Sequence, residues 1–259
     1  GAAVRNLKQG DRVLVACTTG CGACTACRRG LYGACSVTTS GGTAQNVFGF
    51  SHGLPGGQAE AARVPFADTN LFRVPESLSD EELLFLSDIL PTGYMGTELA
   101  QVGPGDVVVV FGCGPVGMLA QMCAQLRGAA RVIAVDIDPL RLAAARARGF
   151  DTVDSSLEDV RDKVLEWTDG LGADATIEAV GRPELVQSAV AITRAGGHIA
   201  VIGLITQAVS LPWPQIFMKN LSLHWGLVSP QVFIPRLLPL IEQGRLDPAS
   251  IISHRLALA

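Results

Sequence analysis

The residues with the clearest chemistry are four cysteines, at Cys21, Cys24, Cys27 and Cys35 in the run CGACTACRRGLYGAC. Their thiolates can converge on one tetrahedral zinc ion, with Zn–S bonds of about 2.3 Å. Four protein ligands leave no position for water, which is typical of structural rather than catalytic zinc. Two disulfides, or buried thiols that happen to be close in sequence, are the alternative. The regular spacing favours zinc.

A glycine-rich segment is the second candidate site. Residues 112–117 read GCGPVG, which is the pattern G-x-G-x-x-G. The motif follows an apolar run (106–111), precedes an expected helix, and leads to a second apolar run (131–136) that ends in an acid. In this context the glycines allow a tight turn, the approach of a pyrophosphate, and close helix–strand packing. The predicted cofactor-binding residues of this loop are Gly112, Gly114, Pro115, Val116 and Gly117.

Asp136 ends the second apolar run, 24 residues after Gly112. A carboxylate there can accept hydrogen bonds from ribose hydroxyls but would repel a 2′-phosphate, which predicts NAD rather than NADP. Arg141 is expected over the same ribose. The alternatives are an ordinary polar strand end for Asp136 and a solvated helix residue for Arg141.

Alternating strands and helices from about residue 105 predict a parallel, doubly wound α/β sheet. Strands are expected at residues 106–111, 131–136, 152–153, 173–180, 198–203 and 220–225. Helices are expected after Asp138, near Pro183 and over residues 237–243. The uncharged run 107–126 has the length of a membrane span, but its glycine turn indicates a buried strand followed by a helix. The first 88 residues consist of short β-like runs.

Composition excludes several classes of partner. The 259 residues are 48% apolar and 17% charged with a net charge of −4, so neither nucleic acid nor a membrane is expected as a partner. Seven cysteines, in a sequence that shows no signal peptide, predict the reducing cytoplasm.

Several further motifs carry a family resemblance: GDRVLV, GGQAE, LSDILPTGY, VFGCGPVG, KNLSLHWG and IISHRLAL. With the cysteine run, they resemble the zinc-dependent alcohol dehydrogenases of the medium-chain dehydrogenase/reductase family, in the branch with glutathione-independent formaldehyde dehydrogenases. The resemblance implies a Rossmann-type NAD-binding domain (89–228) and a partial, β-rich GroES-like catalytic domain with a structural-zinc lobe (1–88). A return segment (229–259) and a homo-oligomer, a dimer or tetramer, are also implied.

The resemblance also implies a catalytic zinc. Asp88, in LSDILPTGY, matches one ligand, and Thr92 is expected near the nicotinamide; a helix N-cap is the alternative for Asp88. The other two ligands, a cysteine and a Gly-His-Glu histidine, are expected before Gly1, so the chain is expected to be truncated at both ends. His52 is the one histidine of the four kept as a substitute ligand.

The expected activity is hydride transfer between a small alcohol, or an aldehyde hydrate, and NAD, with catalytic and structural zinc. The alternative is a truncated, non-catalytic module that binds NAD and one structural zinc.

Overall fold

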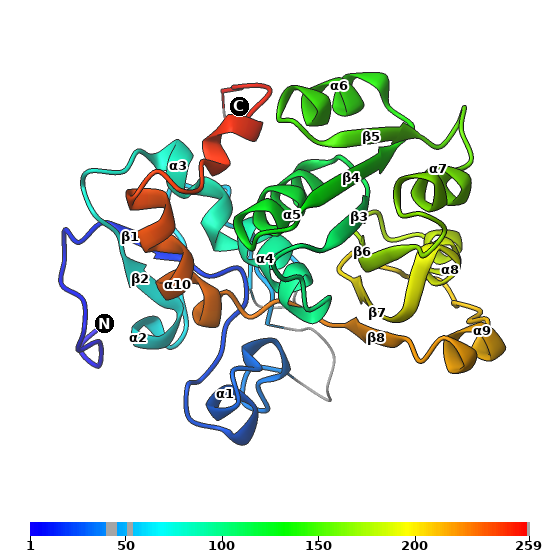
Figure 1. Ribbon diagram of the computed structural model, residues 1–259. Coiled ribbons are helices and arrows are strands. Elements are labelled where there is room, and N and C mark those ends of the chain that lie inside the picture. The colour runs from blue at the N-terminus through cyan, green and yellow to red at the C-terminus, as the bar shows by residue number, and fades with distance from the viewer. Residues whose placement is uncertain (40–45, 51–53, 258–259) are drawn as a thin grey trace. The chain divides into compact units, whose positions relative to one another are not determined.

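A computed structural model gives the fold and describes residues 1–39, 46–50 and 54–257. The chain divides into two compact units (Figure 1). One comprises Gly1–Pro91 with Leu227–Ala259, and the other comprises Thr92–Gly226.

The second unit is built on a parallel six-stranded sheet in the order β5-β4-β3-β6-β7-β8. Its strands are β3 (Val107–Phe111), β4 (Arg131–Asp136), β5 (Asp151–Asp154), β6 (Ala173–Glu178), β7 (Thr193–Val201) and β8 (Ser222–Trp225). All six overlap the predicted strands, although β7 begins five residues before the predicted residue 198. The chain winds outward from β3 to β5 and then returns to β6 on the other side of β3. The strand order therefore reverses between β3 and β6, the position where doubly wound sheets bind ligands.

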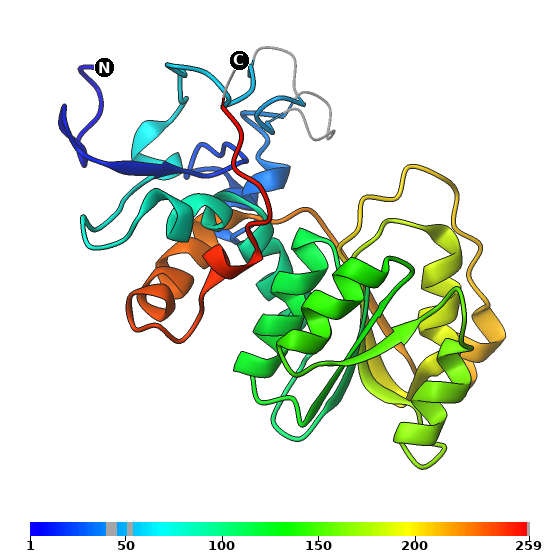
Figure 2. The same cartoon turned by 90° about the horizontal axis from the view of Figure 1, so that it is seen from above.

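Helices cover both faces of this sheet (Figure 2). They are α5 (Pro115–Leu126), α6 (Pro139–Ala147), α7 (Val160–Trp167), α8 (Pro183–Ile192) and α9 (Trp213–Met218), with α4 (Ile89–Leu99) beside α5. As predicted, Asp138 caps α6: its side chain accepts hydrogen bonds from the backbone N–H groups of Leu140 and Arg141. The core consists of apolar strand residues such as Val109, Ile133 and Ile199, which are fully buried because both faces are covered.

The uncharged run of membrane-span length is a strand, a turn and a helix, as predicted. It forms β3, the glycine loop and α5. Among the described residues, none of the helices combines the length and the apolar character that crossing a membrane requires.

The first unit contains one small antiparallel sheet in its described part, formed by β1 (Val13–Val15) and β2 (Leu71–Arg73). Its helices are short: α1 (Thr25–Arg28), α2 (Ala67–Asn70), α3 (Asp80–Leu84), and the 3-10 helices η1 (Tyr32–Ala34), η2 (Phe85–Ser87) and η3 (Pro248–Ile251). The exception is α10 (Pro230–Glu242), which begins seven residues before the predicted residue 237. Pro235 and Pro239 lie inside it, and internal prolines are ordinarily helix breakers, which explains the late prediction.

Candidate metal and cofactor sites

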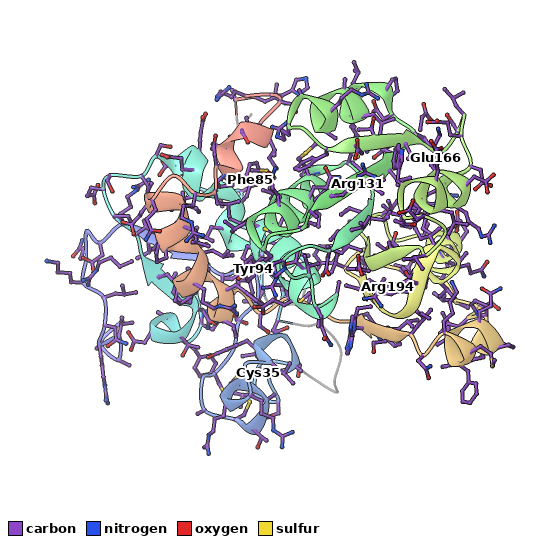
Figure 3. The ribbon with its side chains drawn as sticks, in the orientation of Figure 1. Cys35, Phe85, Tyr94, Arg131, Glu166 and Arg194 are labelled. Carbon is purple, nitrogen blue, oxygen red and sulfur yellow. The ribbon has the colours of Figure 1, made fainter. Side chains whose placement is uncertain are left out.

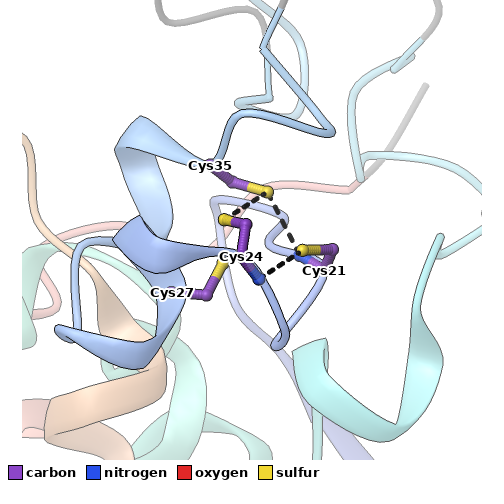
Figure 4. A group of neighbouring side chains, drawn as sticks. All are labelled: Cys21, Cys24, Cys27 and Cys35. Carbon is purple, nitrogen blue, oxygen red and sulfur yellow. Dashed lines mark hydrogen bonds between the residues drawn. The ribbon is translucent and has the colours of Figure 1, made fainter.

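The four cysteines converge in the first unit (Figure 4). Their sulfur atoms all lie within 4.8 Å of one another, and the Sγ atoms of Cys24 and Cys35 are 3.8 Å apart. A tetrahedral ion with bonds of 2.3 Å separates its sulfur ligands by about 3.8 Å. All seven cysteines are free thiols, so the disulfide alternative does not describe this structure. The cluster therefore fits a zinc ion without rearrangement of its backbone.

Local structure places these thiols. Cys24 and Cys27 lie at the start and within the single turn of α1, and Cys35 ends η1. Backbone N–H groups point at the sulfurs: Cys21 donates to the Sγ of Cys35 at 3.3 Å, and Cys24 donates to the Sγ of Cys21 at 3.3 Å. Gly22, at φ +74°, makes the turn between the first two cysteines. N–H groups aimed at sulfur stabilise thiolates, the form that binds metal.

The pKa values of the thiols diverge in the absence of a cation. A hydrogen bond from the backbone of Cys27 lowers the pKa of Cys24 to about 5, whereas burial raises the pKa of Cys27 to about 12. Four adjacent thiolates repel one another, so only a divalent cation lets all four ionise together.

A buried polar network holds the segment that leads into Cys21. The Asn46 Nδ2 donates to the carbonyl oxygens of Thr19 at 2.6 Å and Tyr32 at 2.9 Å. Asn70 accepts from the backbone N–H of Gly20 and donates to its carbonyl oxygen, both at 2.9 Å. Because these amides satisfy backbone groups that water cannot reach, they fix the cysteine loop on the rest of the unit.

In the second unit, the three motif glycines differ in what a side chain would meet. Gly112 has φ +99°, and a Cβ on Gly117 would stand 2.0 Å from the carbonyl oxygen of Gly112. These two glycines are required by the fold itself. Gly114 is different, because its φ of −68° suits any residue and the nearest atom to its Cβ position is the Arg141 Nη1 at 3.9 Å. The fold leaves open the space that a bound pyrophosphate would fill.

The start of α5 faces the same loop. Gly114 is its N-cap residue and offers no side-chain cap, and Pro115 follows at the first helical position. The first intrahelical bond is donated by Met118, so the N–H groups of residues 116 and 117 have no partner within the helix and lie at the positive end of its dipole. These groups are suited to an anion such as a phosphate.

Asp136 and Arg141 lie beside this loop. The Asp136 carboxylate accepts hydrogen bonds from the backbone N–H groups of Cys113 at 2.6 Å, Ile137 at 2.7 Å and Asp138 at 3.0 Å. It thus fastens the end of β4 to the glycine loop, and its Oδ2 atom, which among the described residues accepts only the bond from Cys113, retains acceptor capacity. Arg141 is half exposed, pairs with Asp138 at 3.7 Å, and extends its guanidinium toward Gly114. The structure brings these predicted residues together at one edge of the sheet.

Asp88 lies directly between η2 and α4, and Thr92 is in the first turn of α4. Two residues further on, Tyr94 (Figure 3) stacks under the Arg127 guanidinium, 5.7 Å from the ring centre. Gly93 permits α4 to approach α5, because a Cβ there would stand 2.8 Å from the backbone nitrogen of Ala120. This contact gives the Thr-Gly-Tyr element a packing role within the second unit.

Sequence reasoning missed that Asp88 has Cys17 as a neighbour. Burial, the charge of Asp88 and a hydrogen bond to its carboxylate raise the pKa of the Cys17 thiol well above its usual range. Among the residues that the structure describes, the only group of three or more potential metal ligands is the cysteine cluster. His52 lies outside the described residues. Asp88 and Cys17 supply two donors, and a catalytic zinc needs three, so the described residues do not by themselves fit a catalytic zinc.

A second residue missed by the sequence reasoning is Glu178, at the end of β6. Its carboxylate is fully buried and accepts hydrogen bonds from the loop that follows. The signal in the sequence was an acid at the end of a predicted strand, ADATIE, as at Asp136.

Comparison with known proteins identifies the family of the chain. Residues 1–76 match the family described as alcohol dehydrogenase GroES-like domain, and residues 115–243 match the zinc-binding dehydrogenase family. The zinc-type alcohol dehydrogenase-like protein AdhB of Bacillus subtilis (strain 168) is 34% identical over all of this chain and 76% of its own length. Glutathione-independent formaldehyde dehydrogenase of Pseudomonas aeruginosa (strain PAO1) is 33% identical, over 97% of this chain and 72% of its own length.

Among solved structures, the alcohol dehydrogenase TADH from Thermus sp. ATN1 superposes with a TM-score of 0.91 at 35% identity. The match covers 98% of this chain and 72% of that one. The chain belongs to the zinc-dependent alcohol dehydrogenase family, whose members are oxidoreductases that use zinc and a nicotinamide dinucleotide. The predicted fold class, a Rossmann-type sheet with a GroES-like part, is confirmed.

Proposed function

We propose that this chain binds NAD in preference to NADP and serves hydride transfer between that cofactor and a small alcohol or an aldehyde hydrate. The observation that carries the proposal is the open space at Gly114, between the start of α5 and the Asp136 carboxylate. A pyrophosphate there would meet backbone N–H groups, and the adjoining ribose would meet Asp136. Arg141 supports the same site, because its guanidinium lies where it can pair with a phosphate.

The four cysteines are the proposed ligands of the structural zinc. Their support is the mutual distance of the sulfurs and the N–H groups aimed at them. Bound there, zinc would crosslink a 15-residue segment that has only short helices of its own.

Asp88 is proposed as an oxygen ligand of the catalytic zinc, and Thr92 as a residue near the nicotinamide. A carboxylate suits zinc, but it needs two further protein ligands to form a catalytic site. The domain roles proposed for the chain follow the sequence expectation: residues 1–88 and 229–259 belong to the catalytic domain, and residues 89–228 form the nucleotide domain. We place the protein in the cytoplasm, in keeping with its free thiols.

A homo-oligomer is also part of the proposal. Strand β8 pairs only with β7 in the described sheet, so its other side is an edge. Near it lie exposed aromatic and apolar side chains: Trp213, Phe217 and Met218 of α9 and Trp225 of β8 are 65–79% exposed. Large exposed apolar groups beside a strand edge are typical of subunit interfaces, and a second copy would offer the same surface.

Sedimentation analysis should give a dimer or tetramer, and Phe217→Lys should shift the equilibrium toward the monomer. A wild-type monomer would contradict this assignment.

Cofactor titration tests the main proposal. The chain should bind NADH, and NAD should compete with it more strongly than NADP does. Failure to bind either dinucleotide at millimolar concentration would overturn the assignment, because the site would then lack its principal ligand.

A further inference from the structure

Glu178 is a buried acid for which the cofactor site described above gives no role. It is 0% exposed. Its Oε1 atom accepts hydrogen bonds from three successive backbone N–H groups, of Val180 at 3.0 Å, Gly181 at 2.8 Å and Arg182 at 3.4 Å. Its Oε2 atom has no hydrogen-bond partner within the part of the chain that the structure describes. A buried carboxylate oxygen without a partner is costly, so its retention needs a reason.

The backbone at Glu178 joins two other segments. Its carbonyl oxygen accepts from the N–H groups of Ile202 at 2.8 Å and Gly203 at 3.0 Å, which follow β7. The next residue, Ala179, donates to the carbonyl oxygen of Phe111 at 2.9 Å, directly before the glycine loop. The chain at this position therefore connects the segments that follow β3, β6 and β7.

The loops after β6 and β7 are in backbone contact. A Cβ on Gly203 would stand 2.2 Å from the backbone nitrogen of Gly181 and 2.6 Å from the Oε2 of Glu178. A Cβ on Gly181, which has φ +89°, would stand 2.6 Å from the carbonyl oxygen of Leu204. The two loops therefore meet backbone to backbone at these glycines, and the Glu178 carboxylate lies against both: its Oε1 is bonded to the loop after β6, and its Oε2 lies beside Gly203 after β7.

These loops lie on the side of the reversal point opposite to Asp136. Asp136 ends β4, on one side of β3, and Glu178 ends β6, on the other. A dinucleotide spans the two halves of such a sheet. With its adenosine half at Asp136, its other half would lie over the carboxyl ends of β6 and β7.

We propose that Glu178 is a positioning residue for the nicotinamide half of the cofactor: it fixes the loops 179–182 and 202–204 from beneath, without touching the cofactor. The inference rests on the proposed dinucleotide function. The adenosine half, held at Asp136 and the glycine loop, does not depend on Glu178.

The substitution Glu178→Gln should affect binding of the nicotinamide half of the cofactor and spare binding of the adenosine half. Glutamine keeps the volume and one acceptor oxygen, but it replaces Oε2 by an NH₂ group that must find acceptors in a fully buried position. The loops must then shift to accommodate it. Glu166→Gln is the matched control, because Glu166 is an exposed acid on α7 whose ion-pair partner, Lys163, lies on the same helix.

The experiment is calorimetric titration of the full chain with NADH and, separately, with ADP-ribose, which lacks the nicotinamide. For Glu178→Gln we expect NADH affinity to fall by about tenfold or more, which is about 1.4 kcal/mol, with ADP-ribose affinity within about threefold of wild type. Glu166→Gln should leave both affinities unchanged. An equal fall in affinity for both ligands, or no fall for either, would overturn the positioning role. If the wild type binds neither ligand, the proposed cofactor function itself fails.

A measurement on the wild type covers the case in which Glu178→Gln does not fold. Binding of NADH should slow hydrogen exchange of the backbone amides in residues 179–182 and 202–204, and ADP-ribose should leave these amides unchanged. Equal protection by both ligands, or protection by neither, would contradict the inference.

Discussion

Replacing Gly114 by alanine should abolish tight cofactor binding while leaving the fold intact. The backbone at Gly114, φ −68° and ψ 179°, suits alanine, and its Cβ would have no atom closer than 3.9 Å. The free energy of unfolding should therefore stay within about 1 kcal/mol of wild type, because alanine restricts the unfolded chain but is a poorer N-cap residue than glycine.

The effect on binding follows from the same geometry. The methyl group would occupy the space before the N–H groups of α5, so the pyrophosphate would lose at least one hydrogen bond of a charged group. Such a bond contributes about 1.5–3 kcal/mol, and NADH affinity should fall by about 10-fold to 150-fold.

Gly117→Ala provides the contrast. Its Cβ would stand 2.0 Å from the Gly112 carbonyl oxygen, so backbone must move and stability should fall by about 1–3 kcal/mol or more. Gly103→Ala, with its nearest atom 3.8 Å away, is the neutral control. Urea unfolding measures stability, and NADH fluorescence titration measures affinity. If Gly114→Ala binds NADH as the wild type does, the open space is not the pyrophosphate site and the reasoning is refuted.

Three further predictions concern the metal, the ribose and a buried acid. Elemental analysis should find one zinc per chain, and Cys21→Ser should lose it and destabilise the first unit; a zinc-free wild type would contradict the four-thiolate site. Asp136→Ala should narrow the preference for NAD over NADP by about tenfold or more in competition titrations, because a carboxylate repels a 2′-phosphate; an unchanged ratio would place Asp136 away from the ribose. Burial raises the pKa of Glu178 against the pull of its three N–H groups. The native state then holds this proton more tightly than the unfolded chain. The protonated Glu178 carboxyl therefore contributes fully to the free energy of unfolding at pH values below its ordinary pKa of 4.5. This contribution is lost as the pH rises through the raised pKa of the native state. In Glu178→Gln the free energy of unfolding should change less with pH over this range than it does in the wild type. An equal pH dependence in the two proteins would exclude Glu178 as its source.

The sequence by itself determined the features that depend on near neighbours. The cysteines converge because they lie within 15 residues, and the glycine loop forms because its glycines and the flanking apolar runs are contiguous. Strands buried on both faces are nearly continuous apolar runs, so β3 and β4 of the parallel sheet were visible as such, whereas the edge strands β5 and β8 are shorter and more polar. The cap at Asp138 follows from a side chain that bonds to its own backbone, two residues on.

Tertiary structure decided what depends on residues far apart in sequence. Cys17 meets Asp88 because the chain folds back after β1: the Cys17 N–H donates to the carbonyl oxygen of Ser87 at 3.0 Å. The role inferred for Glu178 depends on strand order, which places β6 beside β3 and β7. The same holds for α10, whose internal prolines hid a helix that packing of its apolar face stabilises. Local patterns encode burial and turns, whereas contacts between distant segments follow from how strands and helices pack, which no short window of sequence contains.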